Sequence, residues 1–389
     1  MPDPTRDGRQ RVAVFVSPHG FGHAARAAAV MAAIRNRVPT VAFEVFTTVP
    51  AWFFTEALDG GIRHHPLSCD VGLVQHDGLH EDPTGTAGVL ARRLPFDRGA
   101  VMLLAELLDR LGVGLVVADI APLGLAVAAA ADIPSLLVEN FTWDFIYRGY
   151  ASECPALGRC ADELEPVFAQ ATFCVRSRPS CGSATGDLTV GPISRRSRHP
   201  RAGVRAALAI PADVPALLIT MGGIPSPLVG LDHLQTCRDA VFIVPGGSGQ
   251  TETRDNLRLL PHHSRFYHPD LVAACDGVIG KLGYSTVAET WAAGVPFAWV
   301  PRPSFPESAP LAAFVTTEMD GVMLTPEDLA AGRFDTSIDR LLEFGRMPGR
   351  ERHPPHRGTG AAQVAALAEA LLTGVSRHDA LAAARDVAG

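Results

Sequence analysis

The chain has 389 residues, of which 47% are hydrophobic and 19% are charged, and its formal net charge is -7 at pH 7. This length suits two domains of average size, and the composition is that of a globular protein. The acidic balance provides no overall positive field, so we expect no nucleic-acid partner. A site for an anionic ligand has to be built locally.

The sequence carries no targeting or membrane signal that we recognise. Its first ten residues, "MPDPTRDGRQ", lack the apolar core of a signal peptide, and no run reaches the roughly 18–20 apolar residues of a membrane span. The 7 cysteines show neither a C-x-x-C pair nor another zinc spacing. We therefore expect a cytoplasmic protein with reduced thiols, and no pattern indicates an oligomeric state.

Apolar runs alternate with alanine-rich runs along most of the chain. In the first half, the sequence predicts strands at 11–17, 113–119 and 134–141 and helices at 24–37 and 99–112. Short, continuously apolar strands separated by helices are typical of a parallel sheet that is covered on both faces.

The same pattern starts again after a stretch rich in proline and arginine at 192–200. We therefore expect an α/β fold of two Rossmann-like, doubly wound domains that face each other across a cleft, with domains at 1–191 and 192–389. The last predicted helix, 360–372, can pack back on the N-terminal domain, and 345–360 is predicted to be a loop. Ligands are expected at the carboxyl ends of the strands.

The first predicted strand leads into a glycine-rich loop, "SPHGFGHAARAAAV" at 17–30. The pattern Gly20-x-Gly22-x-x-Ala25 is similar to a dinucleotide-binding fingerprint. Such a site also needs an acidic residue at the end of the second strand, to bind the ribose. Glu44 has roughly that spacing, but it lies inside the predicted strand, which disfavours dinucleotide binding.

Two histidines lie in this loop. His19 and His23 are four residues apart, but the glycines between them prevent a shared helical face, which disfavours zinc binding. A histidine at a strand-to-helix turn can also act as a general base, because imidazole titrates near neutral pH. Simple capping of the following helix is the structural alternative.

The segment "VIGKLGYSTVAETWAAGVP" of the second half predicts a strand, a glycine-containing loop and a helix. Free N–H groups at the start of that helix, with Lys281 nearby, form a local site for a diphosphate. Glu289, one turn into the helix, suits the two hydroxyls of a ribose, and an ordinary exposed helix acid is the alternative.

Other segments extend these two sites. Glycines after the strand "ALLIT" leave the backbone free to approach a phosphate, "SRFYHPD" can hold a nucleobase, and "VPRPSFPESAPL" can contact sugar hydroxyls. The residues predicted to bind such a nucleotide diphosphate sugar, called the donor below, are Gly222, Gly223, Arg265, Phe266, Lys281, Gly283, Tyr284, Ser285, Thr286, Glu289, Arg302 and Glu307. In the first half, the polar and aromatic residues of "ENFTWDFIY" suggest a surface that contacts a second substrate, called the acceptor below. Capping of the following helix is the alternative. The predicted acceptor-binding residues are Gly20, Phe21, Gly22, Asp119, Asn140, Trp143 and Asp144.

The chain resembles the GT-B glycosyltransferases. It is most similar to the glycosyltransferase-like N-terminal region of plant L-arabinokinases and their stand-alone bacterial homologues, and more distantly to the lipid-linked N-acetylglucosaminyltransferase of peptidoglycan synthesis. The matching blocks are in order and span nearly the whole chain: "HGFGHAAR", "VQHDGL", "VADIAPLGLAVAAAADIPSLLVENFTWDFIY", "GKLGYSTVAETWAAGVPFAWVPRPSFPES" and "GTGAAQVAALAEALL". We do not expect arabinokinase activity, because the chain has no length left for a galactokinase-type domain.

The resemblance implies that the second domain binds the donor and the first binds the acceptor. His23 occupies the position of the family's histidine in the glycine loop. Ser285 and Thr286 match the diphosphate-binding helix start, Glu289 matches the acid that binds the ribose, and Glu307 matches the residue facing the donor sugar.

We therefore expect an enzyme that transfers a sugar from a nucleotide diphosphate sugar, with a UDP-sugar favoured, to a hydroxyl of a small-molecule acceptor. His23 is the expected base, His19 is its alternative, and direct displacement implies inversion. No Asp-x-Asp motif occurs, so we expect no metal, and no cofactor beyond the nucleotide sugar as co-substrate. A nucleotide-sugar epimerase, a non-catalytic nucleotide-sugar-binding regulator and a dehydrogenase are the alternatives.

Overall fold

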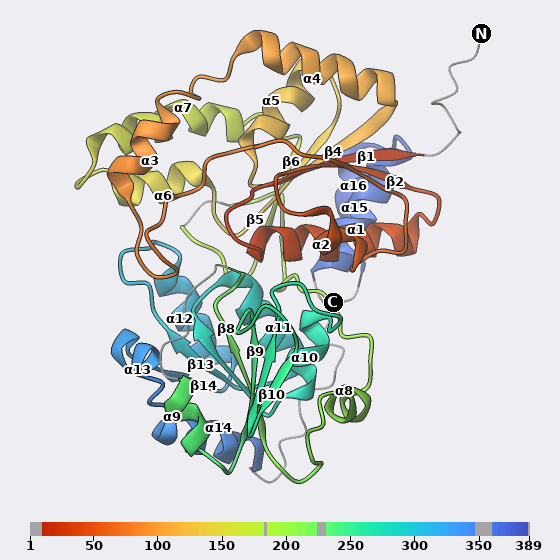
Figure 1. Cartoon of the computed structure of the whole chain (residues 1–389). Helices are drawn as coiled ribbons and strands as arrows, with labels where there is room; N and C mark the ends of the chain where they lie inside the picture. Colours follow the sequence, from red (N-terminus) through yellow and green to blue (C-terminus); the bar gives the residue numbers. More distant parts are fainter. Residues whose placement is uncertain (1–9, 183–184, 224–230, 347–359, 388–389) are drawn as a thin grey trace. The chain divides into compact units, whose positions relative to one another are not determined.

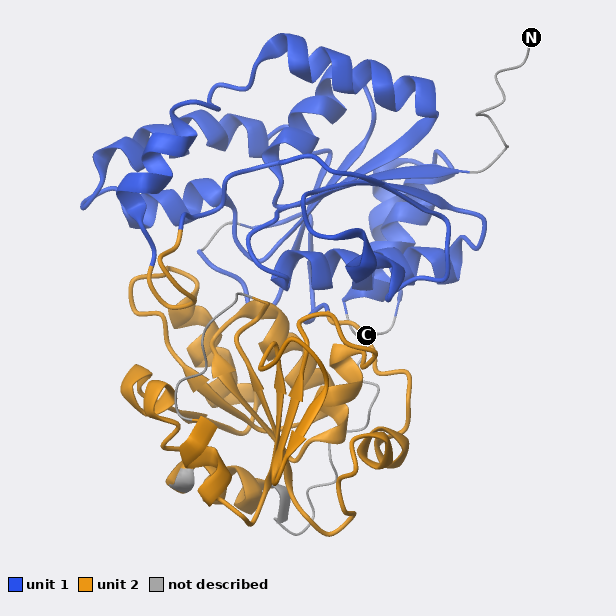
Figure 2. Cartoon of the chain, in the orientation of Figure 1, with its two compact units in different colours: residues 1–74, 81–193, 358–389 blue, residues 75–80, 194–357 orange. Residues whose placement is uncertain are grey.

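The computed structural model describes residues 10–182, 185–223, 231–346 and 360–387 and divides the chain into two compact units. Unit 1 comprises residues 1–74, 81–193 and 358–389, and unit 2 comprises residues 75–80 and 194–357 (Figure 2). Among the described residues, each unit contains one seven-stranded sheet with helices around it. Each unit is therefore an α/β unit with its own core.

The sheet of unit 1 is parallel and has the order β3-β2-β1-β4-β5-β6-β7. This is the doubly wound order, in which the winding direction reverses between β1 and β4. Figure 1 labels β1, β2, β4, β5 and β6 of this sheet. The strands are β1 (Arg11–Val16), β2 (Ala42–Phe46), β3 (Ile62–His65), β4 (Val113–Asp119), β5 (Ser135–Glu139), β6 (Phe173–Ser177) and β7 (Leu188–Val190). The helices are α1 (Gly22–Arg37), α2 (Ala51–Thr55), α3 (Pro83–Leu90), α4 (Arg98–Leu111), α5 (Pro122–Ala130), α6 (Trp143–Gly149), α7 (Pro155–Phe168), α15 (Ala361–Leu372) and α16 (Arg377–Arg385).

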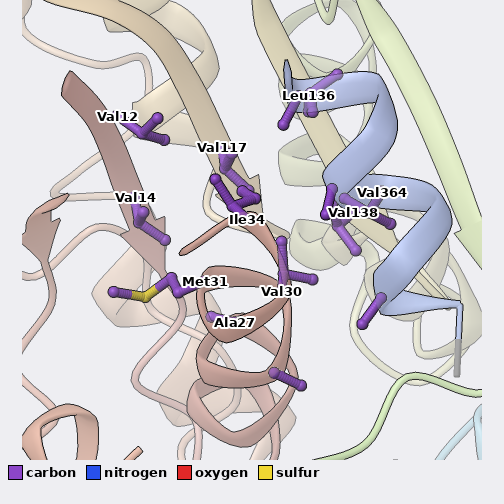
Figure 3. Packing of buried hydrophobic residues seen from close by; sticks show 14 of the residues in the cluster. Val12, Val14, Ala27, Val30, Met31, Ile34, Val117, Leu136, Val138 and Val364 are labelled. Atoms are coloured by element: carbon purple, nitrogen blue, oxygen red, sulfur yellow. The ribbon is translucent and has the colours of Figure 1, made fainter. Parts of the chain in front are cut away.

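Both faces of this sheet are buried, because alternate residues of a strand point to opposite faces. Val12 and Val14 of β1 belong to the core that includes α1 and α15, while Ala13 and Phe15 belong to the core that includes α4 and α5. Figure 3 shows side chains of β1, β4, β5, α1 and α15 in the first of these cores. Each large apolar side chain buried there contributes roughly 1.5–3 kcal/mol to folding.

Unit 2 repeats the same winding. Its sheet has the order β10-β11-β9-β8-β12-β13-β14, with only β10 antiparallel to its neighbour among the described strands, and the winding reverses between β8 and β12. The strands are β8 (Ala216–Thr220), β9 (Val241–Pro245), β10 (Glu252–Arg254), β11 (Leu257–Leu260), β12 (Gly277–Lys281), β13 (Phe297–Val300) and β14 (Gly321–Met323). The helices are α8 (Arg201–Ala207), α9 (Leu231–Thr236), α10 (His268–Ala274), α11 (Tyr284–Ala293), α12 (Ser308–Glu318), α13 (Pro326–Ala331) and α14 (Asp335–Arg346). The prediction of two Rossmann-like, doubly wound domains is confirmed.

The observed units lie close to the expected domains 1–191 and 192–389, with the boundary at 193/194, and the last helix packs on the N-terminal unit as the sequence suggested. The C-terminal helices α15 and α16 belong to unit 1, because the apolar face of α15 packs against α1 and β4. Residues 75–80 belong to unit 2, where Leu79 lies against the core. Of the predicted loop at 345–360, the start lies in α14, and residues 347–359 are outside the described residues.

Candidate active site

The first candidate site lies at the carboxyl ends of β1 and β4, where the sheet of unit 1 reverses its winding. After β1 the chain turns at Gly20, whose φ of 71° favours glycine, and it enters α1 at Gly22. His23 therefore lies in the first turn of α1, and Asp119 is the last residue of β4. Ligands of doubly wound sheets bind at such switch points, so the predicted loop lies where a site is expected.

His23 and Asp119 form a buried pair at this switch point. Nδ1 of His23 is 3.0 Å from Oδ1 of Asp119, and the two side chains are 10% and 1% exposed. Nδ1 also lies 3.4 Å from Nη2 of Arg26, but its shorter contact is with the carboxylate. Because an ionised carboxylate only accepts hydrogen bonds, we assign the proton of the neutral ring to Nδ1, which leaves a lone pair on Nε2. The pair thus has the arrangement that a general base requires. Sequence reasoning assigned Asp119 only to acceptor binding, because no local signal links two positions 96 residues apart.

Arg26 shares Asp119 with His23. Its Nε donates to Oδ2 of Asp119 at 2.8 Å, its Nη2 donates to Oδ1 at 2.7 Å, and its Nη1 donates to Oδ1 of Asn140 at 2.5 Å. Burial acts to raise the pKa of Asp119, but the charges and hydrogen bonds of Arg26 and His23 outweigh it and hold that pKa below its usual value. Asp119 is therefore ionised at neutral pH and fixed in place. Asn140 is fully buried in the same network, and its contact with an acceptor stays a prediction.

His19, the alternative base, has a different environment. Its Nδ1 accepts a hydrogen bond from the backbone N–H of Leu73 at 3.4 Å, and its ring meets Trp143 edge-on with a centroid distance of 5.3 Å. At 3.4 Å this hydrogen bond is long, and the partner of Nδ1 is a donor rather than a carboxylate that could orient the ring and stabilise its protonated form. This geometry favours His23 over His19 as the base.

The other predicted acceptor-binding residues are partly engaged inside unit 1. Phe21 packs on Trp52 and Phe53, with ring centroids 5.7 and 4.8 Å away. Trp143 is fully buried. Asp144 is half-buried in the first turn of α6, and burial raises its pKa. Contact between these side chains and an acceptor stays a prediction.

Asp70 is a buried carboxyl that sequence reasoning did not single out. Its Oδ2 accepts a hydrogen bond from Nε1 of Trp143 at 2.9 Å, and its Oδ1 is buried without a hydrogen-bond partner among the described residues. Burial raises the pKa of Asp70 to about 6, against the lowering effect of Ser17, His23 and Trp143. The folded protein therefore holds a proton on Asp70 more tightly than the unfolded chain does.

Replacing Asp70 by asparagine is expected to stabilise unit 1 at pH 8 but not at pH 4. Because the pKa of Asp70 moves from 3.8 to about 6 on folding, the stability of the natural protein falls as pH rises through this interval. The penalty at high pH is about 3 kcal/mol, and a neutral amide does not incur it. Thermal unfolding at both pH values measures the difference, with Asp59→Asn, an exposed position, as the control. A stability gain of equal size at pH 4 and pH 8 would contradict the assignment.

The second candidate site lies at the carboxyl ends of β8 and β12, where the sheet of unit 2 reverses its winding. Gly222 and Gly223 follow β8 with φ values of 67° and 82°, so this turn requires glycine. A Cβ atom on Gly222 would lie 3.2 Å from Cε of Lys281, the last residue of β12. Lys281 is buried, and it is the only lysine of the whole chain. The glycine turn and Lys281, both of which the sequence predicted to bind a diphosphate, therefore lie next to each other.

Helix α11 begins directly after this point. Its N-cap residue, Gly283, has no side chain with which to cap the helix, and Tyr284, Ser285 and Thr286 form the first turn. Tyr284 and Thr286 are buried, while Ser285 is half-buried. The N–H groups at a helix start carry partial positive charge, which together with Lys281 favours an anion.

Glu289 lies in the second turn of α11, where both of its oxygens have partners. Nε of Arg195 donates to Oε1 and Nδ1 of His268 donates to Oε2, each at 2.9 Å, and the Glu289 side chain is 3% exposed. Burial acts to raise the pKa of Glu289, but Arg195 and His268 outweigh it and keep that pKa below its usual value. A carboxylate has about four lone-pair positions, so a ribose contact has to use the remaining ones. That contact stays a prediction.

The remaining predicted donor-binding residues lie in loops of unit 2. Arg265 is exposed, and its guanidinium carbon lies 5.0 Å from the ring centre of the half-buried Phe266. The guanidinium carbon of Arg302 lies 3.9 Å from the ring centre of Phe305, and both Arg302 and Glu307 are buried. Glu307 is the N-cap residue of α12. Their contacts with a donor stay predictions.

Three further observations concern the dinucleotide acid, metal ligands and membrane helices. Glu44, the acid considered for a dinucleotide, accepts hydrogen bonds from Arg11 at 3.1 Å and from His65 at 2.7 Å inside unit 1. Among the described residues, no group of three or more His, Cys, Asp and Glu side chains is arranged to hold a metal ion. The described helices also include none that is both long and apolar enough to cross a membrane.

Comparison with known proteins identifies the architecture. The calicheamicin glycosyltransferase CalG4 matches 95% of this chain and 100% of its own, with a TM-score of 0.58 at 16% identity. Arabidopsis thaliana UGT89C1, complexed with UDP-L-rhamnose, matches 96% of this chain and 98% of its own, with a TM-score of 0.54 at 16% identity. The chain has the GT-B fold. The GT-B resemblance seen in the sequence is thereby confirmed.

The sequence of this GT-B chain is also similar to that of a plant protein. It is 29% identical over 338 residues to the L-arabinokinase of Arabidopsis thaliana, a match that covers 85% of this chain and 32% of that protein. The GT-B chain thus spans about a third of the length of that relative. No protein-family model matches the chain.

Proposed function

We propose that this protein is a glycosyltransferase that moves a sugar from a nucleotide diphosphate sugar to a hydroxyl of a small-molecule acceptor. The observation that carries the proposal is the buried His23–Asp119 pair at the switch point of a doubly wound sheet. Such a pair supplies a base, while the second switch point supplies the anion-favouring groups around Lys281. Sugar transfer needs both: a base for the acceptor hydroxyl and groups that stabilise the departing diphosphate.

In this mechanism, Nε2 of His23 takes the proton of the acceptor hydroxyl as its oxygen attacks the anomeric carbon of the donor sugar. Asp119 stabilises the imidazolium that forms, since its carboxylate already holds Nδ1. The bond from the anomeric carbon to the diphosphate oxygen breaks, and the negative charge passes to the nucleotide diphosphate. Lys281 and the start of α11 stabilise that charge without a metal ion. One displacement inverts the anomeric centre.

The comparisons support the donor class. UGT89C1 has structures complexed with UDP, with UDP-L-rhamnose and with quercetin, and CalG4 is a glycosyltransferase of the same fold. We therefore favour a UDP-sugar as co-substrate, a small molecule as acceptor and no further cofactor.

Replacing Lys281 by methionine is expected to weaken UDP binding about tenfold or more, because one charge-assisted hydrogen bond to a phosphate is lost. Isothermal titration with UDP measures the change, and Arg333→Met, an exposed cation of the same unit, is the control. A Lys281→Met protein that binds UDP as tightly as the natural one would contradict the diphosphate site.

A screen of UDP-, dTDP-, GDP- and ADP-sugars by thermal shift, followed by mass spectrometry of candidate acceptors, tests the reaction itself. Transfer of the sugar to an acceptor supports the proposal. Consumption of the donor without an acceptor would identify an epimerase, and binding without turnover would identify a regulator. If no nucleotide binds, the donor site is wrong.

A further inference from the structure

His268 is an accessible side chain of unit 2 that sequence reasoning did not single out. It begins α10, and its side chain is 27% exposed, whereas the side chains of its neighbours Glu289 and Arg195 are only 3% and 6% exposed. Of these three groups, His268 is the one that a ligand reaches most readily.

The two nitrogens of the His268 ring have different partners. Nδ1 lies 2.9 Å from Oε2 of Glu289, and Nε2 lies 3.4 Å from Oγ1 of Thr220. Because the carboxylate accepts, Nδ1 carries a proton and Glu289 fixes the orientation of the ring. The contact at Nε2 is long for a hydrogen bond, so Nε2 retains the capacity for a better partner.

The side of the ring with Nε2 lies next to Thr220, which directly precedes the glycine turn assigned to the diphosphate. Thr220 ends β8, and its Oγ1 is 3.4 Å from the backbone nitrogen of Gly222. Gly222 is in turn the residue whose Cβ would meet the Lys281 side chain. Thr220 thus links Nε2 of His268 to the glycine turn, and that turn passes close to the Lys281 side chain.

We propose that His268 is a ligand-contacting residue of the donor site, which donates from Nε2 to the diphosphate while Glu289 positions its ring through Nδ1. This proposal rests on the proposed function, because it assumes that unit 2 binds a nucleotide diphosphate. When both ring nitrogens carry a proton, both donate: Nδ1 to Glu289 and Nε2 to a phosphate oxygen.

Two substitutions distinguish a direct contact of His268 with the diphosphate from a role in which His268 only holds Glu289. The side-chain amide of asparagine lies near the position of Nδ1, so His268→Asn keeps the bond to Glu289 and loses Nε2. The amide of glutamine reaches the position of Nε2, so His268→Gln keeps a donor toward the diphosphate and loses the bond to Glu289. If Nε2 contacts the diphosphate, UDP binds His268→Gln more tightly than His268→Asn, and His268→Asn is weakened about tenfold or more.

Isothermal titration of both variants and the natural protein with UDP and with 2′-deoxy-UDP tests the proposal, with thermal unfolding as a check on folding. The expected loss in His268→Asn is the same factor for both nucleotides, because it does not involve the ribose. The proposal is overturned if His268→Asn binds UDP as tightly as, or more tightly than, His268→Gln, since His268 then serves only to hold Glu289. It is also overturned if the loss disappears with 2′-deoxy-UDP. A natural protein that binds neither nucleotide would instead refute the UDP donor site itself.

Discussion

Replacing His23 by glutamine is expected to lower the rate of sugar transfer about 10²–10⁴-fold, which is the usual contribution of a general base. Glutamine keeps a donor near the ring position but has no nitrogen that accepts a proton at neutral pH. Since His23 makes its polar contact with Asp119 within unit 1, UDP binding to unit 2 is expected to be unchanged. Initial rates by mass spectrometry, with the substrates found in the screen above, measure the effect.

His19→Gln is the matched control for this experiment, because His19 belongs to the same loop. Its Nδ1 has only a long contact with the backbone N–H of Leu73, at 3.4 Å, and no carboxylate partner that would stabilise a protonated ring. Its rate is therefore expected to stay within a few-fold of the natural rate. If His19→Gln shows the large loss of rate and His23→Gln stays within a few-fold of the natural rate, His19 is the base. If His23→Gln folds and transfers sugar at the natural rate, the base assignment is wrong.

Replacing Arg26 by alanine is expected to destabilise unit 1 by about 3–5 kcal/mol, the usual cost of leaving a buried charge without its partner. Arg26 is 1% exposed and makes two hydrogen bonds to Asp119, and a third to Asn140. Without it, the ionised Asp119 retains His23 as its one side-chain hydrogen-bond partner among the described residues, and no cation balances its charge. Urea unfolding followed by circular dichroism measures the change.

Arg37→Ala is the control for Arg26, since both residues lie on α1. Arg37 pairs with Glu369 at 2.7 Å, but the two side chains are 41% and 35% exposed. Solvent screens such a pair, so its loss is expected to cost less than about 1 kcal/mol. Equal destabilisation by both substitutions would mean that the buried network does not hold Asp119 as described.

Much of the architecture can be predicted from the sequence. The expected strand at 113–119 is observed as β4 with the same bounds, and the expected helix at 360–372 is observed as α15. These predictions succeed because helix and strand periodicity are properties of neighbouring residues. The glycine loop was also predictable, because glycines and apolar runs mark where strands end. The helix start expected at Ser285 is observed one residue earlier, at Tyr284 of α11.

The partners of the candidate site residues could not be predicted in this way. Asp119 lies 96 residues from His23, and Arg195 lies 94 residues from Glu289, so no local pattern connects them. Asp70 gave no sequence signal, because its raised pKa comes from burial that only the packed unit creates. The sequence by itself thus determined the order of strands and helices and the loops that carry the chemistry. Only the tertiary structure decided which histidine has a carboxylate partner and which chain segments form each unit, because burial and long-range contacts exist only once the sheets have assembled.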